Sequence, residues 1–424
     1  GNLILRNDAQ LKTRREDIKI ANLNLESGIV EAKHTGGSLS IKKGSVGANG
    51  ELKLGGETTL NLTGAYVDET NNGDLTVEGK LNLHPHSNLN LAQNKIKAAG
   101  ARLEIGGERS FDAITTDANT TLEVNTYLTV SRTDSGTNEI GNLELIMLEG
   151  DSGSNSLSIS NMNLDVGGTA SLDGKQITIN NGELIFSNPQ GTPSFANSTS
   201  LSVNNGDLSF LGTPSFASSS LTVSNGALSF GGTPSFASNS SLTVSNNGEL
   251  ILQSGGSFGD TSLVFTSSIF KPSGSVSLTG SSAFNLNETS SIKLDGNTDL
   301  TQSGIVYWPS IDLNEKELTL NVTEMYCCLH QTGGLTIRAG EKITTGASIF
   351  NVDNPLTIES GGTLTSGSGN VKISGDLTLD GDLVQGGGTL ELKGNGSVTG
   401  KLDMSGATLA LGSEYGLNIT GTLA

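Results

Sequence analysis

The 424-residue sequence has few cysteines, few basic residues and no long apolar run. Two cysteines are too few for a scaffold held together by disulfides. Lys and Arg number 24 against 43 Asp and Glu, which gives a formal net charge of −19. This charge argues against a nucleic-acid partner, because a phosphate backbone needs a basic surface. No apolar segment approaches the roughly 20 residues of a membrane-spanning helix, so we expect no direct membrane span.

An internal repeat of about 20 residues is the strongest pattern in the chain. The hexapeptide Gly-Thr-Pro-Ser-Phe-Ala occurs at residues 191–196, 212–217 and 232–237. Around it, apolar residues alternate with Ser and Thr, as Leu221 and Val223 do, and this period of two is typical of β-strands. Asn225 and Gly226 separate two such strands, and an Asn-Gly pair supplies the positive φ of a tight corner. Each repeat therefore predicts three short strands joined by corners.

Phenylalanines recur at the same period and predict interior columns. One predicted column contains Phe195, Phe216, Phe236 and Phe258, and a second contains Phe210 and Phe230. In a β-helix each such residue lies above its predecessor at the strand spacing of about 4.8 Å. The sequence thus predicts an all-β chain that forms a single right-handed parallel β-helix, or β-solenoid, of roughly 20 rungs over residues 1–424.

Residues 176–270 form an almost uncharged module rich in Phe and Ser, here called the uncharged module, in which only four residues, all acidic, carry charge. This stretch has no Lys or Arg, and it holds nine of the twelve phenylalanines. Two interpretations remain open: a duplicated module whose Phe residues fill the core, or a face of hydroxyl and amide groups through which two copies associate. A neutral patch on an acidic molecule reduces repulsion where two copies meet.

Residues 304–331 break the repeat and predict an irregular rung or a projecting loop. The only tryptophan and both cysteines lie here. The segment is either a loop packed against the core or a contact patch for a partner, with exposed aromatic side chains. The candidate contact residues are Tyr307, Trp308, Tyr326 and His330.

Cys327 and Cys328 are adjacent, so on a strand their side chains point to opposite faces. We expect that they do not easily bond to each other, and that one is a buried apolar residue and the other a free thiol. An intermolecular disulfide through Cys327 or Cys328 stays open as the alternative.

Residues with catalytic or metal-binding potential do not form a convincing set. His84 and His86 are two residues apart, but no third metal ligand is evident, so we interpret them as part of a polar turn. Asp376, Asp380 and Asp382 lie beside glycines, and we interpret them as corner residues. We therefore expect no enzymatic activity, no metal and no cofactor. A polysaccharide-acting β-helix enzyme remains an alternative, which clustered carboxylates in a groove would support.

Rungs of the form Gly or Asn, polar, Leu, polar, apolar occur along the chain, for example at residues 375–379 and 240–251. Together with the acidic composition and the scarcity of cysteine, they resemble the β-helical passenger domains of autotransporter-type bacterial surface adhesins. The resemblance implies an extracellular or cell-surface location, either secreted or anchored to the outer membrane. It also implies a role in adherence, aggregation or biofilm formation.

We therefore expect a non-enzymatic adhesive or structural β-solenoid. Its expected partners are other copies of itself, met laterally or end to end, and a cell-surface protein or glycan, with no nucleic acid. The strand-like segments 3–5 and 415–424 have no evident cap. We expect the terminal rungs to pair with further polypeptide, because open strand edges are templates for association. A fibre subunit that polymerises through these rungs is the alternative function.

Overall fold

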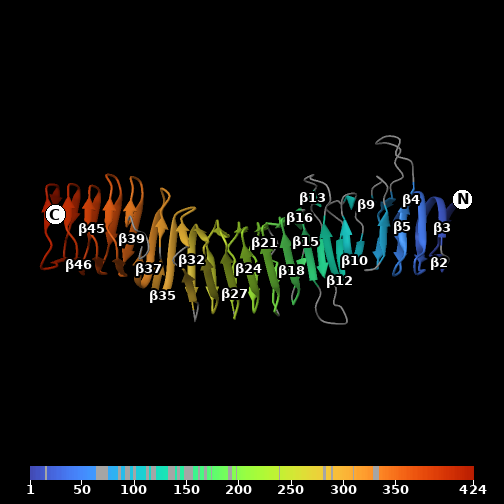
Figure 1. Cartoon of the computed structure of the whole chain (residues 1–424), viewed down its shortest axis with the longest axis horizontal. Coiled ribbons are helices and arrows are strands. Elements are labelled where there is room, and N and C mark those ends of the chain that lie inside the picture. The colour runs from blue at the N-terminus through green and yellow to red at the C-terminus, as the bar shows by residue number, and fades with distance from the viewer. Residues whose placement is uncertain are drawn as a thin grey trace. The chain divides into compact units, whose positions relative to one another are not determined.

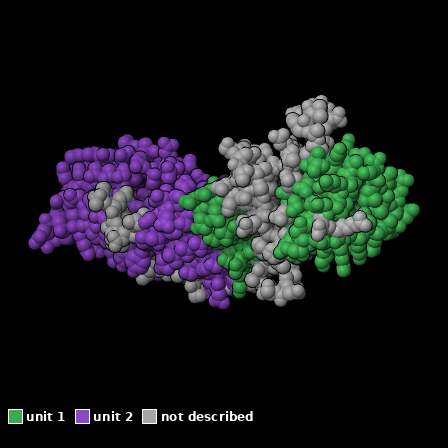
Figure 2. All heavy atoms as spheres, turned by 45° about the vertical axis from the view of Figure 1, so that its right-hand side comes forward, with its two compact units in different colours: residues 1–212 green, residues 213–424 purple. Residues whose placement is uncertain are grey.

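The computed structural model of the chain comprises two compact units, residues 1–212 and 213–424 (Figure 2). The structure describes residues 1–14, 17–63, 75–84, 87–90, 96–98, 102–110, 114–115, 121–131, 139–140, 144–147, 156–160, 163–166, 170–172, 174–189, 193–196, 198–237, 239–279, 283–287, 290–308, 310–327 and 334–424. Within these residues every assigned element is a β-strand and no helix occurs.

The strands of the first unit stack on one another (Figure 1), and their parallel pairings form three sets of ladders. Four strands bend around corners and belong to more than one set: β3 (Asp17–Ala32), β4 (Ser38–Leu54), β10 (Arg102–Ser110) and β12 (Thr121–Ser131). The first set also contains β5 (Thr59–Leu62), β8 (Asn88–Asn90), β15 (Ser156–Ser160), β18 (Gln176–Asn180) and β21 (Ser200–Asn204). The second contains β1 (Asn2–Leu5), β6 (Leu75–Val77), β9 (Ile96–Ala98), β11 (Ile114–Thr115), β13 (Glu139–Ile140), β16 (Asn163–Val166), β19 (Glu183–Phe186) and β22 (Asp207–Phe210). The third contains β2 (Gln10–Thr13), β7 (Lys80–Leu83), β14 (Glu144–Met147), β17 (Ala170–Ser171) and β20 (Ser194–Phe195).

The strands of the second unit form three sets in the same way. Two strands bend between sets: β35 (Thr298–Trp308) and β37 (Glu317–Cys327). The first set also contains β24 (Ser220–Ser224), β27 (Ser241–Ser245), β30 (Ser262–Thr266), β33 (Ala283–Leu286), β40 (Ile349–Val352), β43 (Val371–Ile373), β46 (Thr389–Leu392) and β49 (Thr408–Leu411). The second contains β25 (Ala227–Phe230), β28 (Glu249–Leu252), β31 (Ile269–Pro272), β34 (Ser291–Lys293), β36 (Ile311–Asp312), β38 (Leu335–Ile337), β41 (Leu356–Ile358), β44 (Leu377–Leu379), β47 (Gly396–Val398) and β50 (Leu417–Ile419). The third contains β23 (Ser215–Ala217), β26 (Ser235–Ala237), β29 (Gly256–Gly259), β32 (Gly274–Thr279), β39 (Lys342–Gly346), β42 (Thr363–Ser366), β45 (Asp382–Gln385), β48 (Lys401–Asp403) and β51 (Thr422–Leu423).

Most described strands pair in parallel with the strand one turn later. In the first unit Leu157 of β15 pairs with Ile177 of β18, and in the second unit Leu221 of β24 pairs with Leu242 of β27. These pairings confirm the predicted all-β fold and its parallel β-solenoid. Several turns of the first unit include residues that are not described.

Side chains alternate between the core and the surface along each strand. On β24, Leu221 and Val223 point inward and are buried, whereas the hydroxyl residues Ser220, Thr222 and Ser224 lie between them on the outer face. This alternation has the period of two that strands require. The interior of each unit is therefore a stack of narrow aliphatic and aromatic layers.

Phenylalanine rings fill the interior of the second unit in the column that their spacing predicts. The ring of Phe236 stacks on those of Phe216 and Phe258, with ring centroids 4.5 and 5.0 Å apart. Phe230 lies edge-on to Phe216 and Phe236, at 6.0 Å from each. Stacked and edge-on contacts are the favourable geometries for aromatic pairs, so these four rings form one cluster.

The first unit contains a matching cluster. Phe186 stacks on Phe210 at 4.9 Å, and Phe195 lies edge-on to both rings, at 5.9 and 5.5 Å. All three side chains are buried. The repeating hexapeptide thus supplies the aromatic residues of the third set of ladders in each unit.

The positive φ that the sequence predicts at the Asn-Gly corners is carried by the asparagine. In the second unit Asn225 has φ of 54°, as its side chain tolerates the left-handed conformation. The glycine of an Asn-Gly corner has a different role, which Gly206 in the first unit illustrates. There, a Cβ atom on Gly206 would lie 2.3 Å from the carbonyl oxygen of Gly182 on the preceding turn. The glycine is thus required for the close approach of successive corners.

Candidate functional site

The outward side chains of the uncharged module form rows of hydroxyl groups in the second unit. Ser220, Thr222 and Ser224 of β24 are in register with Ser241, Thr243 and Ser245 of β27. Hydrogen bonds join the rows across turns: the Ser241 hydroxyl donates to the Ser220 Oγ at 3.3 Å, and the amide of Asn246 donates to the Ser224 Oγ at 2.9 Å. These residues form a regular polar surface, which we call the hydroxyl face.

The first unit has a corresponding surface. Thr178 of β18 is in register with Ser202 of β21, and Asn180 with Asn204. The Asn204 side-chain amide donates to the Asn180 Oδ1 at 3.2 Å and also to the Ser202 Oγ at 3.4 Å. Amide and hydroxyl groups can both donate and accept hydrogen bonds. Such a surface can therefore bind another polar surface without a net charge.

The predicted aromatic contact residues separate into one exposed pair and one buried residue. Tyr307 of β35 is in register with Tyr326 of β37, and their rings stack with centroids 5.0 Å apart. Tyr307 is 52% exposed, whereas Trp308 is only 1% exposed. The expectation of an exposed tryptophan was wrong, because adjacent residues on a strand point to opposite faces. His330, the fourth candidate, lies outside the described residues.

Polar side chains adjoin the tyrosine pair. The Asn351 side-chain amide on β40 donates to the Glu324 Oε1 at 2.8 Å and to the Met325 carbonyl at 3.2 Å. A hydrogen bond to the Glu324 carboxylate, together with that charge, raises the pKa of the Tyr326 hydroxyl. Tyr326 therefore remains a protonated donor at neutral pH. The stacked rings and these groups could contact a partner through both apolar and polar atoms.

Asp353 follows β40 and is partly buried. Burial raises the pKa of its carboxyl group, while a hydrogen bond from Ser374 and the positive charge of Lys393 act in the opposite direction. Its Oδ2 atom is buried and has no hydrogen-bond partner within the part of the chain that is described. This carboxyl group also acts on the tyrosine pair, because its charge contributes to the raised pKa of Tyr326.

Cys327 is buried and disulfide-bonded. It therefore presents no free thiol. The only other cysteine of the chain, Cys328, lies outside the described residues. The expectation of an unbonded cysteine was therefore wrong for Cys327, and an intermolecular disulfide stays a prediction.

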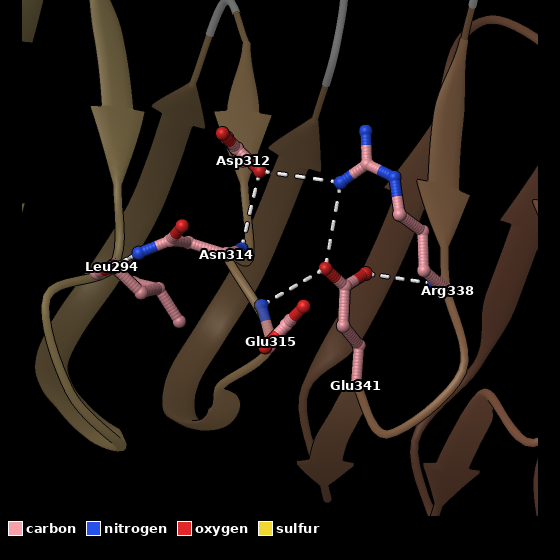
Figure 3. Close-up of polar contacts among 6 residues, drawn as sticks. All are labelled: Leu294, Asp312, Asn314, Glu315, Arg338 and Glu341. Carbon is pink, nitrogen blue, oxygen red and sulfur yellow. Dashed lines mark hydrogen bonds and ion pairs between the residues drawn. The ribbon is translucent and has the colours of Figure 1, made fainter.

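A cluster of polar contacts occupies a corner between the second and third sets of ladders in the second unit (Figure 3). The buried Glu341 carboxylate accepts hydrogen bonds from the Glu315 N–H at 3.1 Å and the Arg338 N–H at 2.7 Å. The Arg338 guanidinium lies 3.4 Å from Glu341 and 3.3 Å from the Asp312 carboxylate. The Glu341 charge, aided by Asp312, raises the pKa of Arg338.

The same corner is joined to the preceding turn. Asp312 also accepts the Asn314 N–H at 3.1 Å, and the Asn314 side-chain amide donates to the Leu294 carbonyl at 2.9 Å (Figure 3). Asn314 and Glu315 both have positive φ, of 51° and 62°. The cluster holds two left-handed residues and three successive corners together. Because these contacts occupy both Glu341 oxygens, we assign the cluster a structural role.

Sequence reasoning missed a second kind of polar residue, the buried hydroxyl at the corner before the first set of ladders. Ser219, Ser240 and Thr261 are buried in the second unit, and each donates to a backbone carbonyl. The Ser240 Oγ, for example, lies 2.7 Å from the Ala237 oxygen. The signal was a Ser or Thr two residues before the first leucine of each repeat. These residues satisfy corner backbone groups and do not reach solvent.

The acidic residues considered as an alternative catalytic set lie at corners. The Asp376 carboxylate accepts the Asn395 N–H at 2.7 Å, and Asp380 accepts a hydrogen bond from Thr399. Both contacts join one turn to the next. Among the described residues no group of three or more His, Cys, Asp or Glu side chains is placed to hold a metal ion.

Comparisons with known proteins give no relative. No family model, no curated protein and no solved structure matches the chain. In the described part of the chain, no helix is long and apolar enough to cross a membrane.

Proposed function

We propose that the chain is a non-enzymatic β-solenoid of a bacterial cell surface that mediates adherence or self-association. The observation that carries this proposal is the hydroxyl face. Its rows repeat at the strand spacing of about 4.8 Å, and their hydroxyl groups remain at the surface. Lys and Arg are absent over residues 176–270.

The charge distribution supports association through this face. A molecule of net charge −19 repels its own copies. Repulsion is weakest where the surface is neutral, so the hydroxyl face is the region through which two copies meet at the lowest electrostatic cost. Ladders of hydroxyl and amide groups then provide many hydrogen bonds, each weak by itself. The exposed Tyr307–Tyr326 pair is a second contact candidate, for a protein or glycan at the cell surface.

The proposal is tested with the double variant Thr222→Glu/Thr243→Glu, which places two charges on adjacent rows of the hydroxyl face. We expect weaker self-association in sedimentation equilibrium and unchanged thermal unfolding, because both side chains point outward. The matched control is Thr357→Glu/Thr378→Glu, which changes outward threonines that are in register on β41 and β44. Equal association of the parent and both variants would contradict the proposal.

A further inference from the structure

The basic residues of this acidic chain are concentrated near its start. Residues 1–63 contain nine Lys and Arg against seven Asp and Glu, a net charge of +2. The other 361 residues contain 15 against 36, a net charge of −21. Charge asymmetry of this kind within one chain indicates a binding region for a ligand of the opposite sign.

Two of these cations, Arg14 and Lys33, lie at one corner of the first unit together with His84. Four successive strands of the third set end at residues that are in register with one another: Thr13, Ala32, Leu54 and Leu83. The residues that follow them in the sequence are Arg14, Lys33, Gly55 and His84. The corner therefore has a row of two cations, one glycine and one imidazole, along the stacking direction of the turns.

A pocket of about 550 Å³ opens at this corner. Its lining residues are Arg14, Lys33, Thr35, Gly56, Glu57 and His84. Glycines give the long side chains room: a Cβ on Gly55 would lie 2.6 Å from the Lys33 Cγ, and one on Gly56 would lie 3.2 Å from the His84 ring. The side chains of Lys33 and His84 thus pack directly over backbone at the pocket.

Within the described part of the chain, Arg14 and Lys33 differ from neighbouring cations in having no ion-pair partner. Arg6 pairs with Glu26 at 2.8 Å, and Lys12 approaches Glu31 at 4.0 Å. Neither Arg14 nor Lys33 forms an ion pair with any residue that the structure describes. An anion in the pocket would therefore gain two attractive interactions without breaking an ion pair between described residues, although it would lie near the Glu57 carboxylate.

We propose that this pocket binds the carboxylate or sulfate groups of an acidic polysaccharide. A polymer suits the corner better than a free ion, because the row repeats along the turns at about 4.8 Å. The Thr35 hydroxyl and the Glu57 carboxylate add the donor and acceptor that sugar hydroxyl groups require. The inference deepens the proposed adhesive function by naming a ligand class, and it involves none of the residues of the hydroxyl face.

The test is calorimetric titration at low salt with a hexamer of galacturonate, and with a neutral glucose hexamer as the ligand control. We expect the parent to bind the acidic hexamer only. Arg14→Gln/Lys33→Gln is expected to weaken binding by about tenfold, since two of the charge-assisted contacts are lost. Lys12→Gln, which removes a nearby cation that is already paired, is expected to change the affinity by less than about twofold.

Arg14 and Lys33 are exposed, so their substitution should leave the thermal unfolding curve unchanged. The single variant Arg14→Gln provides a second measurement in case the double variant does not fold. Equal binding of the neutral and acidic hexamers would overturn the inference, as would full affinity in the double variant. Inhibition of hexamer binding by free sulfate at the same concentration as the hexamer would also overturn it, because a single anion would then suffice. The variant Thr222→Glu/Thr243→Glu should bind the acidic hexamer like the parent, which separates this result from the test of self-association.

Discussion

At the scale of the single residue, strand alternation decides which groups a partner can reach. Tyr307 and Trp308 are neighbours in sequence, yet one is 52% and the other 1% exposed. The same alternation directs Thr222 outward and Val223 inward on β24. Surface chemistry in this chain is therefore carried by every second residue of a strand, while the residues between them form the core.

The aromatic column predicts a large and local cost of truncation. Phe236→Ala removes the ring that contacts Phe216 and Phe258, so the free energy of unfolding should fall by about 3–5 kcal/mol. The loss should be confined to neighbouring turns, because solenoid stability depends mainly on adjacent repeats. Hydrogen exchange should show faster exchange on β23, β26 and β29. Phe236→Leu is the milder comparison, and equal stability of the parent and Phe236→Ala would contradict the packing.

Asp353 predicts a pH dependence of stability. Because burial raises its pKa in the folded state, folding favours the protonated form. The contribution of Asp353 to the free energy of unfolding is fully present below the pKa that this carboxyl group has in the unfolded chain. It is lost as the pH rises through the higher pKa of the folded state. Asp353→Asn should therefore unfold at a higher temperature than the parent at pH 7, and the difference should shrink towards about pH 3. A difference that is independent of pH would contradict this account.

At the scale of the element, the corners determine how strands stack. Short strands of three to five residues have little stability alone, and each is held by the turns before and after it. Asn residues with positive φ, glycines at close approaches and buried Ser or Thr hydroxyls satisfy the corner backbone. The Glu341 cluster performs the same task with charged groups, and it holds β36 and β38 to their neighbours (Figure 3).

The corner cluster predicts a cost for removing its central carboxylate. Glu341→Ala leaves two backbone N–H groups without an acceptor and Arg338 without its nearest buried partner. The free energy of unfolding should fall by about 3 kcal/mol, as for other buried charged hydrogen bonds that lose one partner. Glu359, exposed one turn later, is the control. Equal destabilisation by Glu341→Ala and Glu359→Ala in urea unfolding would show that the cluster has no special role.

At the scale of the whole molecule, charge is unevenly distributed between a slightly basic start, a sparsely charged module without Lys or Arg, and acidic remaining segments. The two proposed interactions therefore predict opposite responses to salt. Added salt screens the repulsion between acidic copies, since the Debye length falls to about 10 Å at 0.1 M. Self-association should become stronger with salt, whereas binding of the galacturonate hexamer should become weaker. Parallel salt responses in sedimentation and calorimetry would contradict this separation.

The repeat and its alternation were sufficient to predict the solenoid and the interior Phe216, Phe236 and Phe258. They could not predict which of Tyr307 and Trp308 faces the core, because a strand in an irregular rung gives no register from sequence. The basic corner was also hidden. Lys33 and His84 are 51 residues apart, a distance set by the variable lengths of connections between strands, so their alignment emerges only from the pairings of β3, β4 and β7.

The account depends most on association through the hydroxyl face, and cross-linking between two copies tests it most directly. Cysteine is introduced at Thr222 or Thr243 on the hydroxyl face, and at Thr357 or Thr378 as the comparison. Each variant is treated with a short bis-maleimide cross-linker at a protein concentration at which the parent associates. We expect covalent dimers from Thr222→Cys and Thr243→Cys, and far fewer from the two comparison sites. Dilution of the protein before the cross-linker is added should prevent dimer formation. Equal dimer yields at all four positions would contradict association through this face.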